Sequence, residues 1–272
     1  MNAAIHLTQW ARLDGDDPLV VMVHGSAQGS RVGGDRHFSA QSSLAVKGWR
    51  VVVPDRPGHG RSPAPGRPDD SEIDGAWIAG LIADGGHLVG HSFGGCVALA
   101  AAALHPERVR SLTLIEPALQ NLEPDNPDIQ SWGRAIGEIY ATASSSADLA
   151  ARFGKLAAIP AGLLGRSGEE LDEDAQAEEM TRLGEGLKMI RLPSEATIRA
   201  NLQVVKSAGV PLLTVSGGWN PGIDAVAKST ARLGGGEYVQ VRSDHHFPHL
   251  VSDEFNSRLL TLLSAGEKPH RA

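Results

Sequence analysis

Six short apolar runs, rich in valine and leucine, recur along this chain and constrain its fold more than any other feature. None of them alternates apolar with polar residues as a half-exposed strand would. Such runs are typical of strands buried on both faces, as in a parallel sheet covered by helices. The six expected strands are 19–23, 50–54, 87–90, 111–115, 211–216 and 238–241.

Segments with a helical pattern separate these runs. Strand–helix alternation of this kind predicts an α/β fold, with a mostly parallel sheet and helices on both of its faces. A short segment at residues 5–13 is expected to form an edge strand or a hairpin. The expected helices of this core are 41–47, 72–82, 94–104, 223–233 and 253–263.

The alternation is interrupted between residues 117 and 209, where we expect helices and no strand. An insertion between the fourth and fifth strands predicts a helical lid over the carboxyl edge of the sheet, where open α/β sheets bind ligands. We therefore expect a core of residues 1–116 and 210–272 and a lid, or cap, of residues 117–209. The expected lid helices are 128–142, 147–156, 173–190 and 194–207.

Composition and charge exclude several classes of protein. The 272 residues include 25 Lys and Arg against 32 Asp and Glu, a net charge of −7, which argues against nucleic-acid and anionic-membrane partners. The single cysteine, Cys96, excludes an internal disulfide framework and a cysteine-rich zinc site. No signal peptide is visible at the start, and no apolar run approaches the ~20 residues that span a bilayer. We expect a cytoplasmic protein that acts on a small molecule, and the oligomeric state stays open.

The segment Gly90-His91-Ser92-Phe93-Gly94 lies between an expected strand and an expected helix. This is the context of the G-x-S-x-G nucleophile elbow, a turn so sharp that the residues two before and two after the serine must be small. The turn lifts the serine hydroxyl above the sheet, and the following helix points its positive N-terminal end at the reacting centre. The sequence therefore predicts Ser92 as a nucleophile.

With these residues the chain resembles the α/β-hydrolase fold family. Three further motifs carry the resemblance: His24-Gly25-Ser26 after the first strand, the run DRPGHGRS at 55–62 after the second, and a histidine before the last helix. The order of serine, acid and histidine is also that of the family. The resemblance covers residues 19–263 apart from the lid. It implies a serine hydrolase that needs no metal and no organic cofactor.

The resemblance also implies the residues that stabilise the reaction's oxyanion. Two backbone N–H groups, those of Ser26 and Phe93, are expected to donate to the negatively charged oxygen that forms during acyl transfer. Gly25 lets the backbone approach the substrate closely. Trp132 and Trp219 are expected to line the substrate pocket.

Eleven histidines could supply the general base, and the family places it in the loop before the final helix. That loop reads Ser243-Asp244-His245-His246-Phe247-Pro248-His249. Aligned with the family's Gly-x-Gly-His pattern, the base is His246, with His245 and His249 as alternatives. A metal site built on these three histidines is a competing interpretation.

The acid of the triad is where the chain departs from the family. Asn220 occupies the usual position of the aspartate, and an uncharged amide cannot stabilise an imidazolium as a carboxylate does. Some members, certain lactonases among them, carry a glutamate at the end of strand four instead, and here that residue is Glu116. Asp224 and Asp244 are weaker candidates, and a dyad without an acid is the remaining possibility.

These residues predict a hydrolase of an ester, lactone or thioester that works through an acyl-enzyme on Ser92. Cofactor-free perhydrolysis or cleavage of a carbon–carbon bond would use the same triad. A ligand-binding receptor on the same fold, without turnover, is the alternative from another class, because fold alone does not fix function.

Overall fold

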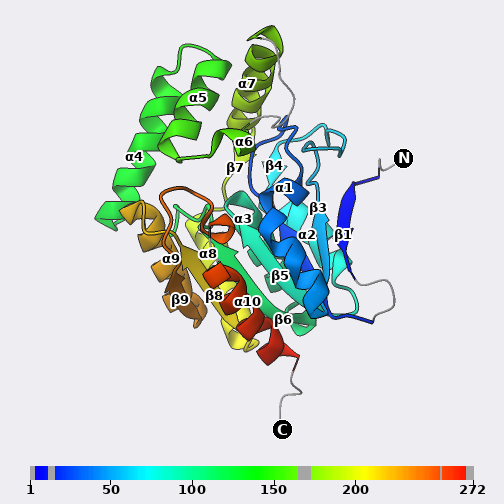
Figure 1. Ribbon diagram of the computed structural model, residues 1–272. Helices are drawn as coiled ribbons and strands as arrows, with labels where there is room; N and C mark the ends of the chain where they lie inside the picture. Colours follow the sequence, from blue (N-terminus) through cyan, green and yellow to red (C-terminus); the bar gives the residue numbers. More distant parts are fainter. Residues whose placement is uncertain (1–3, 12–15, 165–172, 252, 268–272) are drawn as a thin grey trace.

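A seven-stranded sheet forms the centre of the protein, with strand order β1-β3-β2-β5-β6-β8-β9 (Figure 1). The computed structural model describes residues 4–11, 16–164, 173–251 and 253–267. β1 runs antiparallel to β3, and all other neighbours in this sheet are parallel. The mostly parallel sheet expected from the apolar runs is thus confirmed. The strands are β1 (Leu7–Trp10), β2 (Leu19–Val23), β3 (Arg50–Pro54), β5 (Gly86–His91), β6 (Val109–Ile115), β8 (Leu212–Ser216) and β9 (Glu237–Gln240).

Burial differs between the centre and the edges of the sheet. Every residue of β2, β5 and β8 is buried, because helices cover both faces of these strands. The edge strands β1 and β9 contain no buried residue. The expected edge strand at 5–13 is the four-residue β1, which pairs along β3.

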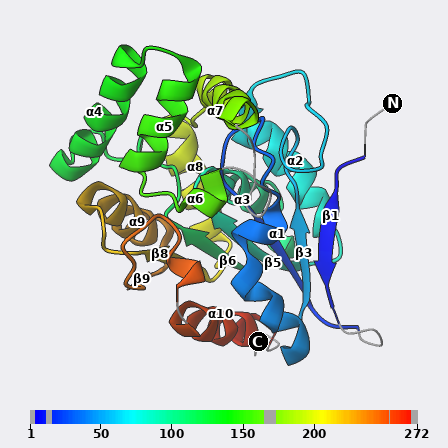
Figure 2. The same cartoon turned by 45° about the horizontal axis from the view of Figure 1, so that its top comes forward.

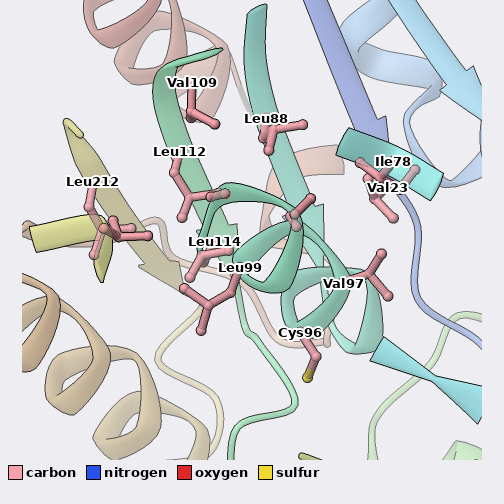
Figure 3. Close-up of a cluster of buried hydrophobic side chains, with 14 of the residues drawn as sticks. Val23, Ile78, Leu88, Cys96, Val97, Leu99, Val109, Leu112, Leu114 and Leu212 are labelled. Carbon is pink, nitrogen blue, oxygen red and sulfur yellow. The ribbon is translucent and has the colours of Figure 1, made fainter. Parts of the chain in front are cut away.

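Helices α2, α3, α8 and α9 cover one face of the sheet. Their apolar side chains form one buried cluster with the strands, and α3 lies at its centre (Figure 3). Leu99 of α3 lies beside Leu112 and Leu114 of β6 in this cluster, while Val97 points to the other side of the helix, toward Ile78 of α2. The helices are α2 (Ser71–Leu81), α3 (Phe93–Leu104), α8 (Glu195–Ser207) and α9 (Pro221–Gly234).

The opposite face is covered by the helix α10 (Asp253–Gly266) and the 3₁₀ helix η1 (Ser39–Lys47). Phe255, Leu259 and Leu263 of α10 pack with Leu44 of η1 against the sheet. The segment 41–47 was expected as an α-helix, but it belongs to this longer 3₁₀ helix. The short helix α1 (Gly34–His37) precedes it and was not expected.

Further helices between β6 and β8 stand together beyond one end of the sheet (Figures 1 and 2). Their inner faces pack with Ala27, which follows β2, in a separate apolar cluster. The last helix of the insertion, α8, instead shares the main core with α3, through Ile198, Leu202 and Val205. The other helices of the insertion are α4 (Pro127–Thr142), α5 (Ser146–Leu156), α6 (Ala161–Leu164) and α7 (Glu173–Lys188).

The expectation that residues 117–209 contain no strand was wrong. β7 (Ile190–Arg191) pairs in parallel with β4 (Asp69–Asp70), so a two-residue ladder joins the insertion to the loop that precedes α2. Two residues are too few to show the alternation by which a strand is recognised in a sequence. Within the described ranges, no helix is long and apolar enough to cross a membrane.

Candidate active site

Ser92 lies in a sharp turn between β5 and α3, with φ 55° and ψ −126°, a conformation that is costly for a residue with a side chain. The glycines on either side make the turn possible. A Cβ atom on Gly94 would lie 2.1 Å from the carbonyl oxygen of Val23, and one on Gly90 would lie 2.4 Å from that of Gly94. The Ser92 amide donates to the Ile115 carbonyl at 2.9 Å, which ties the turn to the end of β6. The loop thus holds a half-buried hydroxyl at the carboxyl edge of the sheet.

Glu116 and His246 meet at the same edge. Glu116 follows β6 with φ 42° and is 1% exposed, and His246 lies in the loop after β9. The Nδ1 atom of His246 is 2.6 Å from Oε2 of Glu116. The carboxylate accepts the Nδ1 proton, so in the neutral ring Nε2 is the free acceptor. Both residues line the cavity that Ser92 also lines.

Two further donors hold the Glu116 carboxylate. The Gly217 amide donates to Oε1 at 2.7 Å, and the indole N–H of Trp219 lies 3.0 and 3.1 Å from the two oxygens. These bonds offset the cost of burying a carboxylate. Trp219 was expected to line the substrate pocket. It is not among the described residues that line this cavity. No sequence signal pointed to its contact with Glu116.

Asn220, at the family's usual aspartate position, caps a helix. Its Oδ1 accepts from the amides of Gly222 at 2.9 Å and Ile223 at 3.2 Å, and Pro221 takes the first helical position of α9. This combination is a favourable start for a helix. Asp224, in the first turn of the same helix, accepts hydrogen bonds from Ser216 and from the Gly218 amide.

The two expected oxyanion donors flank Ser92. Ser26 and Phe93 line the cavity together with it, and Phe93 is the first residue of α3. Ser26 has φ 77°, in the left-handed region. Gly25 packs directly against Ser92, since a Cβ atom on Gly25 would lie 2.6 Å from Cβ of Ser92. The position therefore requires glycine.

Five further histidines are buried in a cluster that contacts His246 through His91. Burial is the largest cause that lowers the pKa of each one, and neighbouring cationic or histidine side chains lower it further, to about 3 for His249. His91 donates through Nε2 to the His246 carbonyl at 2.7 Å, and the two rings lie 4.7 Å apart. This histidine cluster consists of His24, His37, His59, His91 and His249.

The alternatives to His246 have other partners. His249 donates from Nε2 to the His37 carbonyl at 2.8 Å, and Nδ1 of His245 lies 3.2 Å from the Ser243 hydroxyl. Of the three histidines, only His246 contacts Glu116 in the described part of the chain. Among the described residues, no group of three His, Cys, Asp or Glu side chains is arranged to hold a metal ion.

The cavity has a volume of about 480 Å³, within the usual range of small-molecule sites. It extends from Ser92 to the helices of the insertion. Trp132 of α4 lines it, and its ring stands at 89° to that of Trp219, with 6.1 Å between the centroids. Most of its wall is apolar, including Ala150, Ile136, Phe153, Leu183, Leu187 and Ile223.

Comparisons with known proteins show which proteins this chain is similar to. A family model described as alpha/beta hydrolase fold matches residues 18–172. The 2-hydroxy-6-oxo-6-phenylhexa-2,4-dienoate hydrolase of Burkholderia cepacia is 29% identical over 148 residues, which are 53% of this chain and 50% of that protein. The chain thus spans about half the length of this curated relative.

Solved structures resemble nearly the whole chain. A hydrolase from Pseudomonas aeruginosa has a TM-score of 0.66 at 22% identity, with 96% of this chain and 94% of that one covered. The enol-lactonase from Burkholderia xenovorans has a TM-score of 0.63 at 20% identity, with 96% of each chain covered. At these identities the likeness shows a shared fold.

Proposed function

We propose that this chain, which belongs to the α/β-hydrolase fold family, is a hydrolase that cleaves an ester, lactone or thioester of a small or medium molecule. The observation that carries the proposal is the hydrogen bond of 2.6 Å between His246 and the buried Glu116, in the cavity that Ser92 lines. A serine hydroxyl is a weak nucleophile until an adjacent base takes its proton, and this contact supports such a base.

In this proposal each residue has one role. Ser92 attacks the carbonyl carbon while Nε2 of His246 takes its proton, and His246 then returns the proton to the leaving group. Glu116 holds the imidazole in the tautomer with the proton on Nδ1 and stabilises the imidazolium. The Ser26 and Phe93 amides donate to the oxyanion. Water, activated by His246, releases the acyl group.

The cavity supports an apolar, uncharged substrate. Its wall is largely hydrocarbon and aromatic, and a charged group against that apolar part would lose its hydration without gaining partners. We propose the insertion as a cap over the site, formed by helices α4, α5, α6 and α7. α8 lies within the predicted cap of 117–209 but packs in the main core against α3.

A carbon–carbon bond hydrolase with the same triad is the second candidate. The Burkholderia cepacia relative carries the name of a hydrolase of an oxo-phenylhexadienoate, and its match covers 148 residues. A carbon–carbon bond hydrolase would release a carbon leaving group where an ester hydrolase releases an alcohol. A panel that includes both a nitrophenyl ester and a vinylogous diketone separates the two activities.

The experiment that tests the proposal is labelling with a fluorophosphonate, followed by turnover assays. We expect stoichiometric labelling at Ser92, multiple turnovers on short-chain nitrophenyl esters, and loss of both in Ser92→Ala. Ser229→Ala is the matched control, because this buried serine binds Glu123 and does not line the cavity. A Ser92→Ala variant with undiminished turnover would overturn the proposal, and a labelled Ser92 with no turnover would favour a receptor.

A further inference from the structure

Arg56 lies behind the loop that carries the expected oxyanion donor Ser26. The side chain follows β3 and is fully buried, and it does not line the described cavity. Its guanidinium reaches three consecutive carbonyl oxygens of the loop. Nε donates to the His24 oxygen at 2.9 Å, and Nη2 lies 3.4 Å from the Gly25 oxygen and 3.3 Å from the Ser26 oxygen. One side chain thus contacts a carbonyl oxygen of every residue of the His24-Gly25-Ser26 motif.

The peptide between Gly25 and Ser26 is held in one orientation. The Gly25 carbonyl also accepts from Nδ1 of His24 at 2.7 Å, while Nε2 of His24 accepts from the Arg56 amide at 2.9 Å. In a planar trans peptide the C=O and N–H bonds point in opposite directions. A carbonyl fixed on Arg56 and His24 therefore turns the Ser26 N–H away from these two side chains. Ser26 itself lines the cavity together with Ser92.

The same guanidinium touches the residue that supplies the other donor. Its carbon lies 5.0 Å from the ring centroid of Phe93, a cation–π contact. Two buried carboxylates fix the guanidinium in turn, since Nη1 lies 3.0 Å from Asp69 and 3.2 Å from Asp74. A lysine has its donors on a single nitrogen and cannot reach both the carboxylates and the loop carbonyls.

We propose that Arg56 is a positioning residue that preorganises the oxyanion hole. It holds the 25–26 peptide so that the Ser26 N–H faces the reacting oxygen, and it packs beneath Phe93. This inference rests on the proposed acyl-transfer function of Ser92. Donors that are already oriented stabilise the transition state without reorganisation during the reaction. Arg56 therefore acts on the chemical step and not on substrate affinity.

The kinetic test compares Arg56→Lys with Arg67→Met. Arg67 binds Asp74 in the same ion network but makes no contact with the 24–26 loop. For Arg56→Lys we expect kcat on a nitrophenyl ester to fall about 10- to 100-fold, with KM changed less than about twofold. Affinity for a trifluoromethyl ketone, which forms an oxyanion on Ser92, should fall by a similar factor. Arg67→Met should keep kcat within about threefold of wild type, since this change leaves the contacts of the 24–26 loop intact.

A role limited to stability gives a different pattern. In that case both variants lower the unfolding temperature, and neither the kcat nor the ketone affinity of folded Arg56→Lys changes, which would overturn the inference. A second measurement needs no variant: the crystal structure of the wild-type enzyme phosphonylated on Ser92. We expect the phosphonyl oxygen within hydrogen-bond distance of the Ser26 nitrogen, with Arg56 still bound to the Gly25 oxygen.

The phosphonylated structure also separates two failures. If Ser92 takes no label, the proposed function fails. If Ser92 is labelled but the Ser26 N–H points away from the phosphonyl oxygen, or Arg56 has left the loop, the function stands and the inference about Arg56 is wrong.

Discussion

Replacing Glu116 by glutamine tests the assignment of the acid most sharply. The amide has nearly the shape of the carboxylate, so the buried site can accept it. Its oxygen is expected to face the Gly217 and Trp219 donors, as Oε1 of Glu116 does now. The amide NH₂ then faces Nδ1 of His246, where Oε2 lies at 2.6 Å. Two donors cannot bond each other, so His246 must move its proton from Nδ1 to Nε2.

The size of the effect follows from that tautomer. An imidazole with its proton on Nε2 cannot accept the proton of Ser92, and the imidazolium loses its counter-charge. Amide replacement of the acid in a serine-protease triad lowers kcat by about 10⁴. We therefore expect a loss of roughly 10³- to 10⁴-fold here, or about 4–5 kcal/mol of transition-state stabilisation. Folding should change far less.

The assay measures the rate at which Glu116→Gln releases nitrophenolate from a nitrophenyl ester, with thermal unfolding measured on the same samples. Asn220→Ala is the matched control. It removes the cap of α9 and should cost ~1 kcal/mol of stability, with kcat nearly unchanged. Near-wild-type activity in Glu116→Gln, together with inactivity in Asn220→Ala or Asp244→Asn, would refute the reasoning.

Three further predictions concern the buried groups. Burial lowers the pKa of each histidine of the cluster, so these side chains stay neutral in the folded protein but bind protons in the unfolded chain below about pH 6.5. The free energy of unfolding should therefore decrease as the pH falls below this value. At pH 5.5 each histidine should lower the free energy of unfolding by up to roughly 1.4 kcal/mol. Midpoints of urea unfolding that stay the same from pH 7 to 5.5 would contradict this. Burial raises the pKa of the Cys96 thiol to about 12. Iodoacetamide at pH 8 should therefore modify the folded protein about 10³-fold more slowly than the unfolded chain. Rapid labelling of folded Cys96, measured by mass spectrometry, would contradict this prediction. Gly94→Ala should abolish folded, active protein because its Cβ meets the Val23 carbonyl, whereas Gly80→Ala, in open space on α2, should raise the unfolding temperature slightly.

The centre of the sheet was predictable because its strands are buried on both faces. An apolar run such as Leu19–Val23 carries its own signal, and the covering helices carry theirs. The β4–β7 ladder was not predictable, since Ile190–Arg191 pairs with residues far away in sequence and shows no pattern of its own. The 3₁₀ geometry of Ser39–Lys47 likewise depends on tertiary packing, which local propensity does not describe.

The site was only partly predictable. Ser92 is indicated by the glycines that its turn requires, and Glu116 by its place at the end of an apolar strand. The hydrogen bonds from Trp219 to Glu116 and from Arg56 to the 24–26 loop join separate loops of the fold. Such contacts depend on side-chain directions that no local pattern specifies. The sequence therefore indicates the proposed catalytic residues, but it does not indicate the residues that hold them in place.

The most direct measurement is the mass of the enzyme quenched in acid during turnover of a slowly deacylated ester. We expect a mass increase equal to that of the acyl group, carried by the peptide that contains Ser92 and absent from Ser92→Ala. Full turnover with no adduct on Ser92, or an adduct on a different residue, would contradict it.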